Sequence, residues 1–463
     1  MYKSTRGKIK PVNFEQSVLM GLADDGGLLI PAEIPDVSGQ LENWQQLSYT
    51  ELALEVMKLY LDDDDIPVSD LKGLIDKSYS SFENEDITPL VKTDSLYLLE
   101  LFHGPTLAFK DIALQFLGNL FEYLLEKSQS SLNIVGATSG DTGSAAIYGV
   151  RGKKNINIFI MHPEGRVSSI QKQQMTTVRD NNVHNIAIQG TFDDTQRLLK
   201  ELFNDLEFKQ QYNLAAVNSV NWARVLAQIV YYFYAYFRIR EQTGSETVRF
   251  CVPTGNFGNI FAGYLACRMG LPGDKLILAS NENDILAHFF QTGDYVKGNV
   301  HSTHSPSMDI QVASNFERYL YYRCGENPEE VNRLLEDFQR NGHLRIEGDD
   351  PLFTAGRATD EETLATIRDY YQTFNYLLDP HTAVAVKVAR EHEPEDTAPV
   401  VCLATAHPAK FPEAIKEATG KDCARHPTID KIMHLRSRCV SLPPGKEYIA
   451  DFIADRIATP AGQ

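Results

Sequence analysis

The sequence predicts an α/β protein built on open, largely parallel β-sheets, and three features of the chain support this prediction. From about residue 86 onward, short apolar runs bounded by turn residues recur, which is typical of strands covered on both faces of a sheet. Amphipathic segments of helical period alternate with these runs. Glycine- and hydroxyl-rich turns follow several runs at the point where a helix would begin. A chain of 463 residues is long enough for two such sheet domains.

The individual elements can be placed in chain order. Apolar runs predict buried strands at residues 133–137, 156–161, 183–188, 214–217, 248–252, 276–279 and 400–404. Helices are predicted at residues 111–127, 222–241, 260–268 and 382–392, either from a stripe of apolar side chains or from the turn that precedes the segment. The part of the chain before the first strand is turn-rich and then helical from about Tyr49.

This pattern divides the chain into three parts. Residues 1–85 are expected to form an N-terminal unit of their own. Residues 86–130 and 221–463 are expected to form a larger α/β domain, and residues 131–220 a smaller one. Within the larger domain, residues 285–350 are polar and irregular and then helical, so we interpret them as an insertion.

The composition argues against several kinds of partner and site. The formal net charge is −18, so neither nucleic acid nor an anionic membrane is an expected partner. No apolar run reaches the roughly 20 residues of a membrane span, and the basic start leads into no apolar run, so we expect a cytoplasmic protein. The six cysteines are scattered, and His301, His304 and Asp309 lie in an irregular stretch. We therefore expect neither disulfides nor a metal site.

One lysine has the sequence setting of a reactive amine. Lys110 ends the segment F-H-G-P-T-L-A-F-K and precedes an apolar helix that is expected to begin at Asp111. The helix dipole and the neighbouring apolar side chains both disfavour the ammonium form. They should lower the pKa of Lys110 and free the neutral amine for Schiff-base chemistry. The alternative is an exposed lysine at a helix start.

Two glycine-rich turns are expected to bind anions. The segment P-T-G-N-F-G-N at residues 253–259 follows a strand and opens a helix, and its backbone N–H groups suit a single phosphate. The segment A-T-S-G-D-T-G-S-A at residues 137–145 has the same placement and suits a carboxylate or phosphate, although Asp141 in its centre opposes an anion. The alternatives are a tight turn for the first segment and helix capping by Asp141 for the second.

A hydroxyl follows the last predicted strand. The strand at residues 400–404 leads directly to Thr405. Ligands of open α/β sheets lie at the carboxyl ends of strands, so this hydroxyl is a candidate ligand contact. The alternative is a turn residue without a ligand.

The chain resembles threonine synthases of the form found in many bacteria and fungi. The resemblance extends over essentially the whole chain, and the lysine segment is its most specific part. The matching pieces, in the order and spacing of the family, are G-L-A-D-D-G-G-L from Gly21, F-H-G-P-T-L-A-F-K-D from Phe102, T-S-G-D-T-G-S-A from Thr138, N-S-V-N-W-A-R from Asn218, P-T-G-N-F-G-N from Pro253, S-M-D-I from Ser307 and A-T-A-H-P-A-K-F from Ala404.

This resemblance implies a pyridoxal-phosphate enzyme of fold type II, the fold of tryptophan synthase β, with the cofactor between two α/β domains. Lys110 would be the lysine that binds the cofactor, and Asp141 would lie near the cofactor's O3′ side. Thr405 would hydrogen-bond the pyridine nitrogen. The residues that would hold the cofactor phosphate are Gly255, Asn256, Phe257, Gly258 and Asn259.

The implied reaction converts O-phospho-L-homoserine and water into L-threonine and phosphate. The substrate phosphate needs a cation in an otherwise acidic protein, which makes Arg224 a candidate. A dehydratase or β-replacement enzyme acting on serine or threonine, and a catalytically silent ligand-binding relative, are the alternatives. The sequence leaves a monomer and a homodimer open. The expected substrate-binding residues are Ser139, Thr142, Ser219, Asn221 and Arg224.

Overall fold

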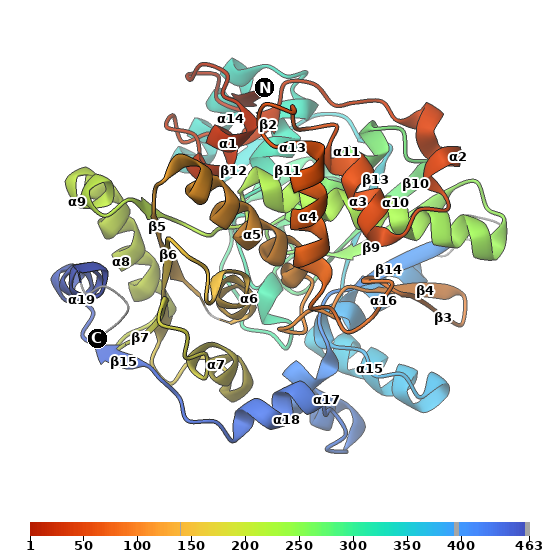
Figure 1. The fold of residues 1–463 in the computed structure, drawn as a ribbon. Helices are drawn as coiled ribbons and strands as arrows, with labels where there is room; N and C mark the ends of the chain where they lie inside the picture. The colour runs from red at the N-terminus through yellow and green to blue at the C-terminus, as the bar shows by residue number, and fades with distance from the viewer. Residues whose placement is uncertain (139, 393–397, 459–463) are drawn as a thin grey trace.

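The computed structural model describes residues 1–138, 140–392 and 398–458, and two open sheets form its framework (Figure 1). The larger sheet has the strand order β13-β10-β9-β14-β4-β3 and is parallel except for β3, which runs antiparallel to β4. Its strands are β3 (Leu90–Thr93), β4 (Leu96–Glu100), β9 (Val248–Pro253), β10 (Gly273–Ser280), β13 (Phe353–Arg357) and β14 (Val400–Ala404).

The smaller sheet has five parallel strands in the order β15-β7-β6-β5-β8. Its edge strand β15 comes from the C-terminal part of the chain, which the sequence interpretation assigned to the larger domain. Helix α19 follows β15 and packs beside α8, as the left side of Figure 1 shows. The strands are β5 (Leu132–Ala137), β6 (Ile156–Pro163), β7 (Val183–Ile188), β8 (Leu214–Ala215) and β15 (Val440–Leu442).

Two small antiparallel pairs complete the described strands: β1 (Tyr2–Ser4) with β2 (Leu29–Pro31), and β11 (Asp294–Val296) with β12 (His343–Arg345). The helices of the first half are α1 (Phe14–Met20), α2 (Leu41–Trp44), α3 (Tyr49–Met57), α4 (Val68–Tyr79), α5 (Lys110–Ser128), α6 (Asp141–Val150), α7 (Ser169–Thr176), α8 (Phe192–Asn204), α9 (Leu206–Gln211) and α10 (Trp222–Thr243). Those of the second half are α11 (Gly258–Arg268), α12 (Ile285–Thr292), α13 (Phe316–Arg323), α14 (Pro328–Asn341), α15 (Asp360–Phe374), α16 (Pro380–Glu391), α17 (Pro412–Thr419), α18 (Pro427–Met433) and α19 (Lys446–Ala458). The 3-10 turns are η1 (Ser38–Gln40), η2 (Pro306–Met308) and η3 (Pro408–Lys410).

Both faces of the larger sheet are covered, as the continuous apolar runs predicted. In β9, Phe250 and Val252 face a core that includes α5, α10 and α11, whereas Cys251 faces a core formed with α15 and α16. Alternate residues of the same strand thus serve two cores. None of the described helices has both the length and the apolar character that crossing a membrane requires.

The first 85 residues, which the sequence predicts as an N-terminal unit, share one continuous hydrophobic core with α10. Trp222 donates its indole N–H to the hydroxyl of Tyr2 at 3.1 Å. Trp44 packs edge-on against Phe233, with 5.7 Å between ring centroids. Tyr2 and Trp44 are far apart in the sequence, yet both contact aromatic side chains of α10. No local sequence pattern indicates that they share this helix as a partner.

The segment expected to be an insertion contains more regular structure than its sequence suggested. Helix α12 occupies residues 285–292, where an irregular stretch was expected, because its apolar residues pack beside β10 and β13. The segment then returns to the cleft between the sheets, where the backbone N–H of Asn315 donates to the carbonyl of Asn256 at 3.1 Å. Residues far along the chain therefore reach the loop that follows β9.

Candidate active site

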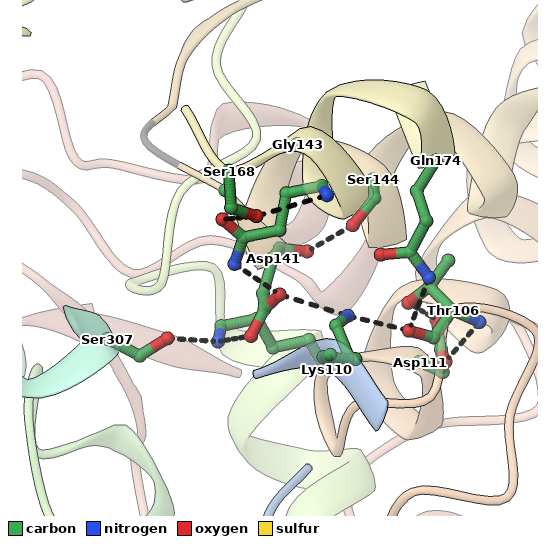
Figure 2. A network of polar contacts seen from close by, with 12 residues as sticks. Thr106, Lys110, Asp111, Asp141, Gly143, Ser144, Ser168, Gln174 and Ser307 are labelled. Atoms are coloured by element: carbon green, nitrogen blue, oxygen red, sulfur yellow. Dashed lines mark hydrogen bonds and ion pairs between the residues drawn. The ribbon is translucent and has the colours of Figure 1, made fainter. Parts of the chain in front are cut away.

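Helices α5 and α6 bring the two sequence-predicted groups Lys110 and Asp141 together. Lys110 is the first residue of α5, and Asp141 is the first residue of α6. The helices pack so closely that a Cβ atom on Gly118 would lie 1.9 Å from the carbonyl oxygen of Gly149, so position 118 has no room for a side chain. The Nζ of Lys110 lies 3.8 Å from Oδ2 of Asp141 (Figure 2). This close helix pair holds the two charged groups at a short, defined separation.

The amine of Lys110 is largely buried. Its side chain is 11% exposed, its Nζ donates to Oγ of Ser307 at 3.4 Å, and it lies 4.9 Å from the ring centroid of Phe109. Burial lowers the pKa of Lys110 to about 8, assisted by the charge of Lys410 and opposed by that of Asp141. The direction expected from the sequence is confirmed, with burial as the main cause.

The turn before Lys110 is folded onto Asp111. The Asp111 carboxylate accepts hydrogen bonds from the backbone N–H and the hydroxyl of Thr106 at 2.8 and 2.7 Å. A Cβ atom on Gly104 would lie 2.4 Å from Cβ of Asp111, so the Gly-Pro turn closes against this side chain. The helix begins at Lys110, one residue before the predicted start. Asp111 therefore fastens the preceding loop and fixes the position from which Lys110 extends.

The loop at residues 253–259 joins β9 to α11, as predicted. Phe257 has a left-handed backbone with φ 64°, and its N–H donates to the carbonyl of Gly255 at 2.8 Å. No side chain of the described residues caps the first turn of α11, so its N–H groups are available to an anion. The Phe257 ring is 1% exposed and packs against Phe316, so this residue would contribute through its backbone. The Nδ2 of Asn259 is buried without a partner among the described residues.

Asn256 and Gly258 complete this loop and line a cavity that Lys110, Arg224 and Thr405 also line. The Oδ1 of Asn256 accepts from the hydroxyl of Ser314 at 3.2 Å, and its carbonyl accepts from Nδ2 of Asn315 at 3.1 Å. A Cβ atom on Gly258 would lie 3.1 Å from that same Nδ2. The loop is thus supported from behind by residues of the segment that precedes α13.

We predict that Gly255→Ala weakens the binding of pyridoxal phosphate, for a reason that the sequence did not reveal. A Cβ atom at this position would lie 2.6 Å from the carbonyl oxygen of Ser307 and 3.3 Å from Cα of Met308, so it displaces the backbone that closes the cavity. A fluorescence titration of the apoprotein with pyridoxal phosphate measures the effect. Gly39→Ala is the matched control, because, apart from Gly39 itself and its chain neighbours, no described residue has a heavy atom within 4 Å of the added Cβ. Equal affinity in both variants would contradict the role of Gly255.

The expected substrate-binding residues fall into different places. Thr142, Ser219 and Arg224 line the same cavity as Lys110, and the hydroxyl of Ser219 forms a 2.7 Å hydrogen bond with that of Ser314. These three residues come from two chain segments that the sequence motifs had singled out separately. Ser139 lies outside the described residues.

Asn221 is not in the cavity, contrary to the expectation from the sequence. Its Oδ1 accepts from the N–H of Ala223 at 3.0 Å and caps α10. Its Nδ2 donates to the carbonyl of Val18 at 2.8 Å. The amide oxygen of Asn221 therefore caps the helix, and its amide nitrogen attaches the N-terminal segment. Both contacts are structural.

Arg224 is a buried cation that has no anionic partner among the described residues. The residue is 4% exposed, and its Nη1 donates to the carbonyl of Asn218 at 2.7 Å. Its Nε is buried without a hydrogen-bond partner, and no carboxylate of the described residues lies within salt-bridge distance. Burial lowers the pKa of Arg224 to about 10, so the guanidinium remains charged near neutral pH. A buried charge without a counter-ion is costly, which favours an anionic ligand here.

Thr405 lies where β14 ends, beside the segment that contains Lys110. Its carbonyl accepts from the N–H of Phe109 at 2.9 Å, and its own N–H donates to Oγ1 of Thr382 at 3.3 Å. These bonds fix the backbone of Thr405, which lines the cavity with Lys110. The role of the Thr405 hydroxyl as a ligand contact stays a prediction.

Three further residues belong to this site but were given no role from the sequence: Ser307, His381 and Lys410. The Nε2 of His381 accepts from the N–H of Ser307 at 3.2 Å, and its Nδ1 faces Oδ1 of Asp379 at 2.8 Å. Asp379 caps α16, and Pro380 is the first residue of this helix. An Asp followed by a Pro is a typical helix start, and it would have placed the helix two residues earlier than predicted. Ser307 lies in the segment S-M-D-I and Lys410 in the segment A-T-A-H-P-A-K-F. Their contacts are set by the tertiary fold, so the sequence did not indicate their roles.

The residues of this cavity fit pyridoxal phosphate. One cavity is lined by a largely buried amine of lowered pKa, by a hydroxyl at a strand end, and by a helix N-terminus and an amide nitrogen that have no side-chain cap and no partner in the part of the chain that the structure describes. The cofactor needs these three features, which are an amine for its aldehyde, N–H groups for its phosphate and a partner for its ring nitrogen.

Comparison with known proteins identifies the family. Models described as threonine synthase N terminus, pyridoxal-phosphate dependent enzyme and threonine synthase C-terminal match residues 1–79, 82–333 and 382–453. A threonine synthase of Schizosaccharomyces pombe is 48% identical over 90% of this chain and 89% of its own length, and one of Pseudomonas aeruginosa is 46% identical over 98% of both. The crystal structure of pyridoxal-phosphate-bound threonine synthase from Brucella melitensis superposes with a TM-score of 0.94 at 44% identity, covering 98% of this chain and 99% of that one. With the site geometry, these matches show that the chain belongs to the threonine synthase family of pyridoxal-phosphate enzymes.

Proposed function

We propose that the protein converts O-phospho-L-homoserine and water into L-threonine and inorganic phosphate, with pyridoxal phosphate bound to Lys110. The observation that carries this proposal is that one cavity is lined by two separate elements that suit anions, the loop at residues 255–259 and Arg224. The loop at residues 255–259 suits the cofactor phosphate, because its N–H groups open a helix. Arg224 is buried without a carboxylate partner in the described part of the chain, which suits a second phosphate on the substrate.

The reaction requires proton transfers that Lys110 is placed to perform. When bound, pyridoxal phosphate supplies an electron sink for the charge that develops as the amino acid loses its Cα proton. The neutral amine of Lys110 would take the proton from Cα and, once it has released that proton, would take one from Cβ. The Cγ–O bond breaks, and the phosphate leaves with the bridging oxygen and the bonding electrons. Water then gives its hydroxyl to Cβ and its remaining proton to the released phosphate. The two protons taken from Cα and Cβ are balanced by those that Cγ gains and Cα regains, so one water is consumed for each phosphate released.

Thr405 offers a prediction about the products of this reaction. Thr405→Val removes one hydrogen bond to the cofactor's ring nitrogen, at an expected cost of about 1–3 kcal/mol, or about 5- to 150-fold in rate. Thr405→Asp is expected to protonate that nitrogen and to divert substrate to 2-oxobutyrate. Steady-state rates and the ratio of threonine to 2-oxobutyrate measure both effects. Thr363→Val is the matched control, because its hydroxyl is bonded to the carbonyl of Thr359 in α15. Unchanged ratios and rates at Thr405 would separate this residue from the cofactor.

The competing functions differ in their need for a second phosphate site. A dehydratase or β-replacement enzyme acting on serine or threonine needs no such site, and a silent relative turns nothing over. Inorganic phosphate is therefore expected to compete with O-phospho-L-homoserine while threonine accumulates. If inorganic phosphate does not compete with the substrate, and if serine is converted to an oxo acid and ammonia, a dehydratase would be favoured. Binding without any turnover would favour the silent relative.

We infer a reducing compartment, the cytoplasm, as the place where the protein works. All six cysteines are free, and two of them, Cys251 and Cys402, are buried in the larger sheet. Unpaired cysteines are typical of proteins that function where thiols stay reduced. Loss of activity in a reducing buffer would contradict this inference.

A further inference from the structure

A second lysine, Lys410, is buried behind the partner of Lys110. It ends the 3-10 turn η3, which follows Thr405 at the end of β14. Its side chain is 0% exposed and is absent from the described lining of the cavity. Its Nζ pairs with Oδ1 of Asp141 at 2.9 Å and donates to the carbonyl of Thr106 at 2.6 Å. Lys410 therefore connects the end of β14 to the start of α6 and to the turn before Lys110.

The two oxygens of Asp141 have different partners. Oδ1 receives Lys410 and the Nε2 of Gln171, both at 2.9 Å. Oδ2 faces Lys110 at 3.8 Å, which is longer than a hydrogen bond (Figure 2). The strong contacts of the carboxylate are thus directed to one side, away from Lys110.

Lys410 and Lys110 compete for the same carboxylate. They are the two cations that form ion pairs with Asp141 in the described part of the chain. If Lys410 lost its charge, Asp141 would retain Lys110 as its ionic partner there. A buried carboxylate so placed favours the ammonium form of a neighbouring lysine, which cannot react with an aldehyde.

We propose that Lys410 is a positioning residue of the active site, which balances the charge of Asp141 and holds it away from Lys110 so that the Lys110 amine stays free to capture the cofactor. The proposal rests on the proposed function, in which Lys110 is the cofactor lysine. Lys410 acts through Asp141 and not through contact with the ligands.

The charges around Lys110 agree with this arrangement. Burial is the largest cause of its lowered pKa, and Lys410 and Arg224 lower it as well, whereas Asp141 and Asp111 raise it. A neutral side chain at position 410 removes the positive charge that lowers the pKa of Lys110. It also leaves the charge of Asp141, which raises this pKa, without its second cation. Both changes act in the same direction, towards the ammonium form.

Asp141 remains ionised near neutral pH, so its charge is present when the cofactor binds. Burial raises its pKa, but the charges of Lys410 and Lys110, with hydrogen bonds from Lys410 and Gln171, outweigh burial and hold the pKa well below its usual range. His381 is a further titratable side chain among the described residues of the cavity, and its Nε2 is occupied by the N–H of Ser307.

The pH dependence of cofactor capture tests the proposal. Apoprotein prepared from the holoenzyme is incubated with pyridoxal phosphate and cyanoborohydride from about pH 6 to about pH 11, and the label on the peptide that contains Lys110 is quantified by mass spectrometry. Capture by the wild type is expected to rise with pH around a midpoint near 8, the pKa of Lys110. Lys410→Met is expected to raise this midpoint by about one pH unit or more. Lys410→Arg keeps the charge and is expected to leave the midpoint close to that of the wild type.

Two further variants separate charge from structure. Asp141→Asn combined with Lys410→Met removes both charges, so the midpoint is expected to return to the wild-type value or below it. Lys153→Met is the matched control, because Lys153 is also largely buried but pairs with Glu122 on the far part of α5. A purely structural role of Lys410 would lower the amount of label without moving the midpoint.

The outcomes distinguish this inference from the function on which it rests. An unchanged midpoint in Lys410→Met, with the label still on Lys110, overturns the inference and leaves the proposed function intact. A wild-type label on another lysine overturns the proposed function itself. If Lys410→Met does not fold, Asp141→Asn alone is expected to lower the midpoint below 8, and an unchanged midpoint in that variant equally overturns the inference.

Discussion

Replacing Lys110 by alanine is expected to lower the rate of threonine formation by about 10³-fold or more. The variant loses the amine that binds the cofactor and the base that moves protons, and a positioned base alone typically contributes about 10²–10⁴-fold. Because Lys110 is the first residue of α5 and its side chain lines the cavity, its replacement is expected to leave the rest of the helix intact. Steady-state assays with O-phospho-L-homoserine measure the rate, and circular dichroism measures the fold.

Lys110→Arg is the informative control for this prediction. It retains a positive charge beside Asp141 but cannot supply a neutral amine near neutral pH, so it is expected to be as inactive as the alanine variant. In the wild type, borohydride is expected to fix the cofactor to the peptide that contains Phe109-Lys110-Asp111. Substantial activity in the arginine variant would mean that another group accepts the protons.

Replacing Arg224 by alanine is expected to reduce kcat/KM for O-phospho-L-homoserine by about 10- to 150-fold. The loss of a charge-assisted pair with the substrate phosphate costs about 1.5–3 kcal/mol. Arg224 stands in the first turn of α10, where the helix dipole adds to its own charge, and its Nε has no partner in the described chain. The deamination of serine or threonine, which brings no phosphate, should be reduced much less. Steady-state rates on both substrates measure the difference.

Arg238→Ala, on the same helix, provides the control for Arg224. Arg238 lies over the ring of Tyr234 and donates to the carbonyl of Gln45, away from the cavity, so both substrates should be affected equally and weakly. An equal loss on both substrates in Arg224→Ala would mean that Arg224 supports the fold or the cofactor. The substrate phosphate would then be held elsewhere, for example by Ser219 and Thr142, which line the same cavity.

The parts of the fold that sequence predicts well are those decided by local patterns. The strands β5, β6, β7, β9, β10 and β14 fall within a few residues of the apolar runs that predicted them, because each run is bounded by turns and buried on both faces. The turn from β9 into α11 was predicted for the same reason, since glycine and the strand end are adjacent in sequence. The strand predicted at residues 214–217 ends at Ala215 because only its first residues pair with β5.

The parts that sequence missed depend on contacts between distant segments. Strand β15 has three residues and joins β7, more than 250 residues earlier in the chain, so no local pattern identifies its partner. Asn221 stands three residues before Arg224 in the segment N-S-V-N-W-A-R, yet its amide oxygen caps α10. Lys410 meets Asp141 only after the turn η3, which follows β14, and the start of α6 are brought together. In each case the residue type was visible, but its partner was set by tertiary packing.

The most direct test of the proposed function is to follow the oxygen of water. The purified holoenzyme is given O-phospho-L-homoserine in ¹⁸O-labelled water, and phosphate and amino acid are analysed by mass spectrometry. Because the Cγ–O bond breaks and water adds at Cβ, we expect one phosphate without label for each threonine that carries one ¹⁸O atom. Label in the phosphate with homoserine as the other product would indicate simple hydrolysis of the phosphate ester, and would contradict the proposed reaction.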